Sequence, residues 1–294
     1  MTIVPGLTAA FGWGIGDFLA RFVAREIGAF RGLFYFQFVG LAALTLYLAG
    51  SGRFADLGNV SDPIAWVWMA LTCALHIFAS FALFRAFEVG VLTLVSPIAA
   101  SYGALTGALS YLSGERLGPV KTIALGAVLL GVLLASASPA EADPAGEPAS
   151  KRRYGGLAPG VSWALAGSVT FGLLFWLLGY RITPAFGPVA PVWLFRLVTP
   201  IVLALLAVPL NRSLGLPRRG LWGLLAVIGA FDTGAFLASS WGLSLGDVTL
   251  TTVLTSLFSA VTVLLAGIFL RERVAPRQWA GVAILLVAIP CTQL

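Results

Sequence analysis

Three ionisable side chains lie deep inside long apolar stretches of the sequence: Asp17, His76 and Asp232. Placing such a group in hydrocarbon costs about 2.5 to 3.5 kcal/mol, so each one needs a partner or a task. A carboxylate can bind an ammonium group, and an imidazole titrates near neutral pH and can pass on a proton. These residue types are therefore candidates for binding a small charged molecule or for relaying a proton.

The spacing of two of these residues is the same. His76 lies 14 residues before Gly90, and Asp232 lies 14 residues before Gly246. If the two segments correspond, both side chains lie near mid-helix and face a shared central cavity. The alternative is that each polar group makes a hydrogen bond between helices and only sets their packing. For Asp17 the alternative is a pair with Arg21, one helical turn away.

Other polar and aromatic side chains share a helix face with one another. Trp13 precedes Asp17 by four residues, which places an indole beside a carboxylate, an arrangement that suits an amphiphilic amino acid or a cation. Hydroxyl groups form a stripe at spacings of four, four and three: Thr251, Thr255, Ser259 and Thr262. Such hydroxyls either line a wet path or bond to the preceding turn of their own helix, and the sequence leaves both interpretations open.

The composition requires a membrane around these residues. Of the 294 residues, 59% are hydrophobic and 10% are charged, whereas a soluble domain has about 25% charged residues. The net charge of +6 comes from short clusters between apolar runs, which excludes a nucleic-acid-binding domain. The sequence has no P-loop, one His, two Cys and no paired intramembrane carboxylates, so we expect no enzyme activity, metal or cofactor.

Ten apolar runs are long enough to cross a hydrocarbon core about 30 Å thick as helices, because lipid leaves no partner for unpaired backbone groups. They cover 3–22, 30–49, 64–86, 91–111, 120–138, 157–180, 189–209, 220–243, 248–270 and 277–293. The predicted fold class is therefore an all-α integral membrane protein with ten transmembrane helices.

A polar linker and a weak repeat divide the chain. Residues 139–156 are rich in Pro, Gly and charges, and they separate two five-helix halves, 1–138 and 157–294. The segment 114–119, GERLGP, matches 271–276, RERVAP, at an offset of 157 residues, and Gly246 follows Gly90 by 156 residues. Since each half has an odd number of spans, the second half must be inverted, which predicts two inverted repeats around a central cavity.

Loop cations indicate the orientation, because cytoplasmic loops carry an excess of Lys and Arg. Alternate connections carry thirteen cations: Arg21, Arg25, Arg31, Arg85, Lys151, Arg152, Arg153, Arg212, Arg218, Arg219, Arg271, Arg273 and Arg277. The opposite face carries four: Arg53, Arg116, Lys121 and Arg181. This count predicts periplasmic termini and a cytoplasmic linker.

Several of these features resemble the drug/metabolite transporter superfamily and, within it, the EamA-type exporters, including those of amino acids. They are the ten-span plan, Trp13-Gly14 in the first run, Arg31 and Arg196 early in the second and seventh runs, and the Glu-Arg-x-x-Pro junctions. The resemblance implies a ten-helix basket that works by alternating access, with a cavity lined by the first, third, fourth, sixth, eighth and ninth helices. It also implies cytoplasmic termini, which disagrees with the cation count.

Several large side chains lie on the helices that the resemblance places around the cavity. They are Trp13, Tyr102, Trp163, Phe171, Trp176 and Trp241. With Asp17, His76, Asp232, Thr251 and Thr255 they are our candidate substrate-binding residues, and for each aromatic residue packing is the alternative role.

The expected function is secondary export of amino acids, including aromatic or other apolar ones, or of similar small metabolites across a bacterial inner membrane. The partners are then a small molecule and the bilayer. One alternative is transport of sugar-nucleotide or phosphorylated compounds, which demands several buried cations, and only Arg196 lies clearly inside a run. A channel and a non-transport membrane enzyme or scaffold are the others. The sequence does not determine the oligomeric state.

Overall fold

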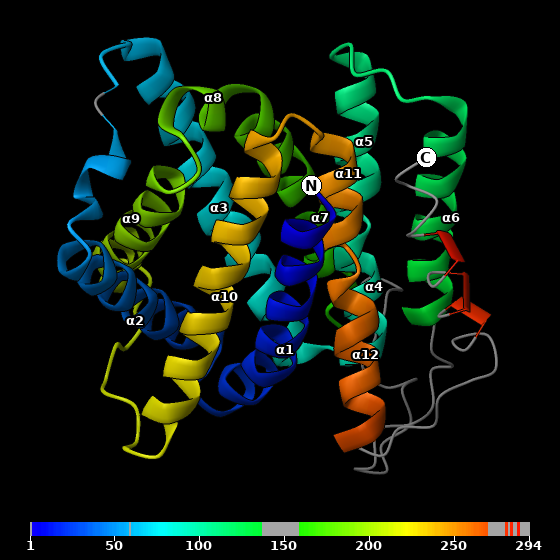
Figure 1. Cartoon of the computed structure of the whole chain (residues 1–294). Coiled ribbons are helices and arrows are strands. Elements are labelled where there is room, and N and C mark those ends of the chain that lie inside the picture. The colour runs from blue at the N-terminus through cyan, green and yellow to red at the C-terminus, as the bar shows by residue number, and fades with distance from the viewer. Residues whose placement is uncertain are drawn as a thin grey trace.

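Apolar runs fold into helices in the computed structural model of the chain, which describes residues 2–58, 60–136 and 159–269, together with 280, 281, 283, 284, 287 and 288 (Figure 1). The backbone N–H and C=O groups of a helix bond to one another within the same segment, so a helix needs no hydrogen bonds from the apolar solvent. No strand occurs among these residues. The all-α membrane class is thereby confirmed.

The helices of the described chain follow one another through short connections. In the first half they are α1 (Ile3–Ile27), α2 (Ala29–Gly50), the 3₁₀ turn η1 (Arg53–Leu57), α3 (Pro63–Val89), α4 (Leu92–Ala100), α5 (Tyr102–Leu112) and α6 (Pro119–Ser136). In the second half they are α7 (Val161–Leu177), the π-helical turn η3 (Leu178–Ile182), α8 (Thr183–Phe186), α9 (Ala190–Ala207), α10 (Leu221–Ser244), α11 (Val248–Thr255) and α12 (Phe258–Phe269).

Seven segments of the described chain are long and apolar enough to span a membrane: Ile3–Ile27, Ala29–Gly50, Pro63–Val89, Val161–Phe186, Ala190–Ala207, Leu221–Ser244 and Val248–Phe269. The expected run 91–111 is divided into α4 and α5, and the run 120–138 forms α6, which contains a shorter apolar helix, Thr122–Gly131. The linker and most of the run 277–293 lie outside the described residues. The described residues therefore contain seven candidate spans, and the count of ten stays a prediction.

Two of the predicted helices are interrupted near the middle. The break between α4 and α5 is at Ser101, and that between α11 and α12 is at Ser256 and Leu257. Tighter i to i−3 hydrogen bonds replace the α-helical pattern there, and the Ser101 and Ser256 hydroxyls bond to carbonyls three residues earlier. Both α11 and α12 begin 156 residues after α4 and α5, an offset that matches the expected repeat.

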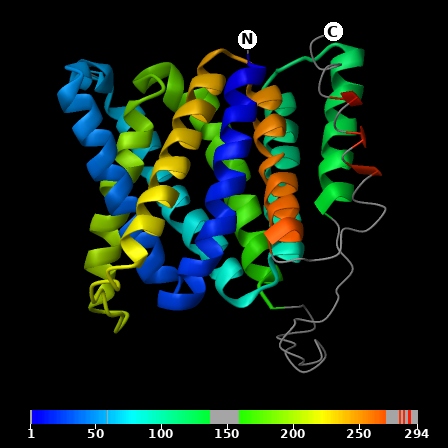
Figure 2. The same ribbon diagram turned by 60° about the horizontal axis from the view of Figure 1, so that its bottom comes forward.

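Helix α1 lies between α10 and α12 (Figure 2), and it also contacts α2, α3 and α11. Glycine allows this close approach. A Cβ on Gly14 would lie 2.5 Å from Val261 Cβ of α12, and one on Gly12 would lie 3.0 Å from Ala235 Cβ of α10. The glycines of the first run therefore bring the backbone that carries Trp13 and Asp17 against the second half of the chain.

The first Glu-Arg-x-x-Pro junction has a structural role at one end of the bundle. Glu115, which follows α5, accepts hydrogen bonds from the Tyr180 hydroxyl at 2.9 Å and from the Thr249 hydroxyl at 2.9 Å. Its carboxylate also accepts the Thr249 backbone N–H at the start of α11. An acidic group at a helix N-terminus satisfies a free backbone donor and the helix dipole, so this contact fixes α5 to α11. The second junction, 271–276, lies outside the described residues.

Candidate functional site

A buried ion pair between α9 and α10 is the main polar feature of the described interior. Arg196 Nη2 lies 2.7 Å from Asp232 Oδ2, and the Arg196 side chain is fully buried. The Trp13 indole N–H donates to Asp232 Oδ1 at 3.1 Å, and Arg196 donates to the Gln37 side-chain oxygen. We call Trp13, Gln37, Arg196 and Asp232 the charged centre. It joins α1, α2, α9 and α10.

The absence of a side chain at Gly40 of α2 leaves room for Arg196. A Cβ at this position would lie 3.2 Å from Arg196 Cδ, 3.3 Å from Arg196 Nε and 2.7 Å from Thr233 Oγ1. Contacts this short require the neighbouring atoms to move, so only glycine leaves the guanidinium in its observed position. The placement of the charge thus depends on a residue of a different helix.

Asp17 lies one turn beyond Trp13 on α1 and is 8% exposed. It is close enough to interact electrostatically with both Asp232 and Tyr102. Asp17 is thus a second buried carboxylate beside the Asp232 of the charged centre, on a different helix.

Aromatic rings from five helices pack beside the charged centre. The Phe236 ring centroid lies 4.9 Å from that of Trp13 and 5.3 Å from Arg196 Cζ. Phe175 of α7 lies 5.6 Å from Trp13 and 5.0 Å from Tyr102 of α5. Phe171 and Phe258 extend the group. We call these six rings the aromatic cluster. They provide an apolar wall next to a charge pair.

His76 is fully buried, and both of its ring nitrogens have hydroxyl partners. Nδ1 lies 3.2 Å from Thr199 Oγ1, and Nε2 lies 3.5 Å from Ser80 Oγ. The ring stacks on Phe195 at 4.5 Å and meets Phe236 at 5.2 Å. Neutral imidazole can donate from one nitrogen and accept at the other, so this geometry favours the packing alternative for His76. The Phe236 ring packs against both His76 and the Arg196 guanidinium, near which we expected a shared cavity.

The remaining candidates divide between the aromatic cluster and other places. The Tyr102 hydroxyl lies 2.7 Å from Thr255 Oγ1, while Thr251 and Thr255 both donate to carbonyls of their own helix. Thr262 donates to the Gly14 carbonyl as well as to its own helix. The hydroxyl stripe is therefore occupied by helix and interhelix contacts.

Three of the predicted tryptophans make their contacts elsewhere. Trp163 packs edge-on against Phe81 at 5.9 Å, and Trp176 donates to Ser113 Oγ at 2.8 Å near the end of α5. Trp241 is 53% exposed on α10. An exposed indole on a membrane helix faces lipid or headgroups, so Trp241 is not brought to the charged centre.

Comparison with known proteins supports the class of the chain. The EamA-like transporter family matches residues 1–137 and 158–292. The chain belongs to this family. Its members are membrane transporters of small molecules and not enzymes. A solved crystal structure shares the fold with a TM-score of 0.75 and 20% sequence identity, covering 99% of this chain and 95% of that chain. No curated protein matches.

In this EamA protein the site contains residues that the sequence-based candidates omitted. Arg196 was noticed as a feature of the resemblance and as the one cation clearly inside a run, but it was not made a candidate, although the cost that singled out Asp17 applies equally to a guanidinium in a span. Gln37 is polar but uncharged, so the cost of placing it in a span is smaller and marks it less clearly. Phe175 and Phe236 had none, because 20 phenylalanines are spread through the chain and their spacing does not distinguish these two.

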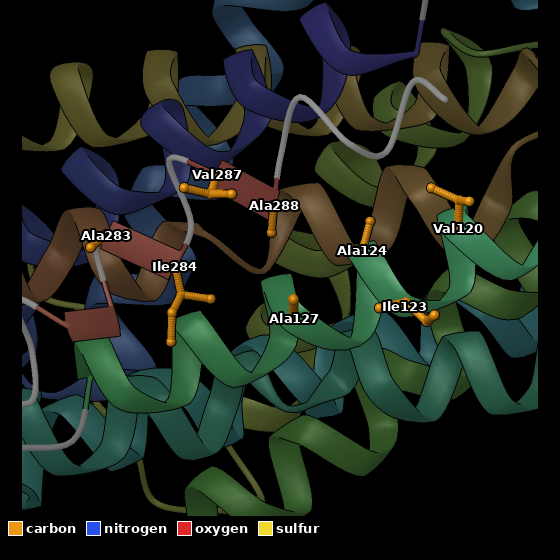
Figure 3. Close-up of a pocket in the computed structure, with 8 residues that line it drawn as sticks. All are labelled: Val120, Ile123, Ala124, Ala127, Ala283, Ile284, Val287 and Ala288. Carbon is orange, nitrogen blue, oxygen red and sulfur yellow. The ribbon is translucent and has the colours of Figure 1, made fainter.

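Two apolar pockets of the EamA protein lie away from the charged centre. One, of about 600 Å³, lies between α6 and residues Ala283, Ile284, Val287 and Ala288, and it is lined by aliphatic side chains such as Ile123 and Ala127 (Figure 3). The other, of about 590 Å³, lies between α3 and α9 and includes Trp66, Cys73 and Leu203. Neither offers a charged group to a substrate.

Proposed function

We propose that this EamA protein is a secondary transporter that exports amino acids with aromatic or other apolar side chains across a bacterial inner membrane. The observation that carries the proposal is the Arg196–Asp232 pair, which lies directly beside the aromatic cluster. An amino acid has the same three parts: a carboxylate, an ammonium group and an apolar side chain.

The pair matches the substrate by charge. The α-carboxylate would bind the Arg196 guanidinium, whose planar donors suit a carboxylate, and the α-ammonium would bind Asp232. Binding would replace the Arg196–Asp232 ion pair with two ion pairs between the protein and the substrate, so no charge would be left unpaired in the membrane. Trp13 and Phe236 would then hold the side chain. His76 supports Phe195 and Phe236 from the α3 side.

Alternating access requires the halves of the chain to move around this centre. We propose the inverted-repeat arrangement for it, with residues 1–138 and 157–294 as the two units. The matched breaks at Ser101 and Ser256 support this arrangement, and so does a family match that falls into two segments of similar length. In transporters with inverted repeats, the substrate site lies between the halves near the midplane.

The charged centre disfavours the alternative of phosphorylated substrates. Its one guanidinium is paired with Asp232, and Asp17 adds a second carboxylate nearby. A phosphate carrying about two negative charges would be repelled by both carboxylates unless several more cations surrounded it.

Counterflow of radiolabelled phenylalanine into liposomes that contain the purified protein and unlabelled phenylalanine tests the proposal. We expect uptake above that of empty liposomes, and we expect Asp232→Asn to reduce it by about tenfold or more, since a contact to a charged group contributes about 1.5 to 3 kcal/mol. The substitution also leaves Arg196 without a counterion, so the variant should unfold at a lower temperature.

Asp62→Asn is the matched control. Asp62 caps the start of α3 by accepting the Ile64 N–H at 2.9 Å, and asparagine can do the same. This variant should transport like the parent. Parental transport by Asp232→Asn at pH 6 to 8, or no counterflow of phenylalanine or any other apolar amino acid, would remove the basis for the proposal.

We also propose the orientation given by the loop cations, with the linker in the cytoplasm. In the structure, the connection 208–220 lies at the opposite edge of the bundle from α8 and the start of α1 (Figure 1). Single cysteines at Ser51 and Ser213, both exposed, should therefore report opposite sides in a chain whose native Cys73 and Cys291 are replaced by alanine. A membrane-impermeant maleimide added to intact cells is expected to label Ser51→Cys and not Ser213→Cys. The reverse pattern would invert the topology and leave the helices unchanged.

A further inference from the structure

The pocket of about 590 Å³ between α3 and α9 is a groove that opens to the surroundings of the bundle. Of its lining residues, Trp66 is 46% exposed, Phe78 is 47% exposed and Leu210 is 54% exposed. Trp66 and Phe81 line it about four helical turns, or roughly 22 Å, apart on α3. One leaflet contributes about 15 Å to the hydrocarbon core, so this α3–α9 groove is long enough to follow a whole acyl chain.

Small side chains make the groove hollow. Ala70, Cys73 and Ala74 of α3 line it, and their spacing places them on one face of the helix. They lie between the larger Trp66 and Phe81. In a membrane such a hollow is filled by lipid tails, but these are as apolar as the protein, so the walls alone give little preference for one lipid over another. A preference has to come from the end of the groove, where a headgroup would lie.

Three arginines closely follow groove-lining residues: Arg31 after Phe30, Arg85 after Phe81 and Arg212 after Leu210. Hydrogen bonds bring their elements together at one end of the bundle. The Ala29 N–H at the start of α2 donates to Glu88 near the end of α3 at 3.0 Å, and Arg31 donates to the Gly215 carbonyl of the connection 208–220. The Arg212 N–H donates to the Ala207 carbonyl at 2.8 Å, which holds Arg212 at the end of α9.

The charge at this end of the groove is incompletely balanced. Arg85 is paired with Glu88 at 2.6 Å. Arg31 bonds to backbone carbonyls, and Arg212 is exposed, and neither has a carboxylate partner among the residues that the structure describes. At the other end, α3 begins at the acidic cap Asp62. The groove therefore has a cationic end, and a long apolar molecule with an anionic head fits it in one direction only.

We propose that the α3–α9 groove binds one acyl chain of an anionic phospholipid, whose phosphate is held by Arg31 and Arg212. Guanidinium groups suit a phosphate, and basic pockets between membrane helices bind anionic headgroups. A second copy of this chain fits the groove less well. Two copies related by an axis along the membrane normal would bring their cationic ends together, and like charges would then meet. The lipid site lies away from the charged centre and does not depend on which molecule is transported.

Native mass spectrometry of the full-length protein, released from detergent micelles, counts bound lipids and protein copies in one measurement. The probes are dioleoyl phosphatidylglycerol and dioleoyl phosphatidylcholine, which have the same chains and differ in net charge. We expect the monomer to bind its first phosphatidylglycerol with a dissociation constant at least about fivefold below that for phosphatidylcholine, because each cation near an anionic headgroup contributes about fivefold to affinity.

One pair of variants tests the headgroup site. Arg212→Gln should raise the dissociation constant for phosphatidylglycerol about fivefold and leave that for phosphatidylcholine unchanged. Arg181→Gln is the matched control, because Arg181 is also exposed but lies in η3, beside α8 at the opposite edge of the bundle (Figure 1). This control should bind both lipids as the parent does.

A second pair of variants tests the chain site. Ala74→Phe fills the groove from α3 and should weaken binding of the first lipid of either kind about tenfold, since the chain loses most of its contacts. Ala43→Phe is the matched control. Ala43 is an exposed alanine of α2 that does not line the groove, so the added ring should leave lipid binding unchanged.

Three results would overturn the inference. Equal dissociation constants for the two lipids, or equal effects of Arg212→Gln and Arg181→Gln, would mean that these arginines hold no headgroup. Parental binding by Ala74→Phe would place the lipid outside the groove. A dimer that Ala74→Phe dissociates would assign the groove to a second copy of the chain. Arg212→Gln changes a single exposed side chain, so the headgroup comparison decides the matter even if Ala74→Phe does not fold.

Discussion

Replacing Arg196 by glutamine is expected to lower the free energy of unfolding by about 3 to 5 kcal/mol, because it leaves Asp232 as an anion without its counterion inside the membrane. Arg196 is fully buried, and its guanidinium lies 2.7 Å from the carboxylate. Asp232→Asn should cause a loss of similar size, since the guanidinium is then unpaired. Unfolding in a mixed micelle of fixed composition, followed by tryptophan fluorescence, measures both.

The double variant, Arg196→Gln with Asp232→Asn, shows whether the loss comes from charge. Two amides can bond to each other, to Trp13 and to Gln37, so we expect the double variant to recover most of the stability that either single variant loses. It should still fail to transport, because neither charge remains to bind the substrate. Additive losses in the double variant would mean that the side chains act independently and that the ion pair does not stabilise the bundle.

Replacing Gly14 by alanine is expected to destabilise the protein by about 1 to 3 kcal/mol, because the added methyl group overpacks the contact between α1 and α12. The new Cβ would lie 2.5 Å from Val261 Cβ and 3.0 Å from the Phe258 carbonyl oxygen. Thr262 also donates to the Gly14 carbonyl at 3.1 Å, so a displaced α1 loses this hydrogen bond as well. The shift carries Trp13 away from Asp232, and phenylalanine counterflow should fall with the stability.

Gly234 of α10 is the matched control for this substitution. It lies within a helix as Gly14 does, but a Cβ there would meet nothing within 4 Å. Alanine has a higher helix propensity than glycine by up to about 1 kcal/mol, so Gly234→Ala should be neutral or slightly stabilising. Equal losses for the two variants would indicate that backbone flexibility, and not close packing of α1, explains the effect at Gly14.

The sequence by itself determined the solvent and the secondary structure of this protein. Low charge and long apolar runs leave the bilayer as the only suitable environment, and in a bilayer such runs must be helices. The cost of ionisable groups in hydrocarbon identified Asp17 and Asp232, of which the structure buries the first and pairs the second with Arg196. The spacing from Gly90 and Gly246 indicated an offset that the breaks of α4 and α11 share.

Only the tertiary structure decided which groups meet. Asp232 is paired with Arg196 and not with His76, and the absence of a side chain at Gly40 of α2 leaves room for the guanidinium there. His76 is bonded to Thr199 and Ser80, an arrangement that favours the packing alternative over the chemical role that its residue type suggested. Trp241, which shares α10 with Asp232, is turned outward. These outcomes depend on the rotation and crossing of helices, which are set by side-chain contacts far apart in the chain and not by the local pattern of apolar residues.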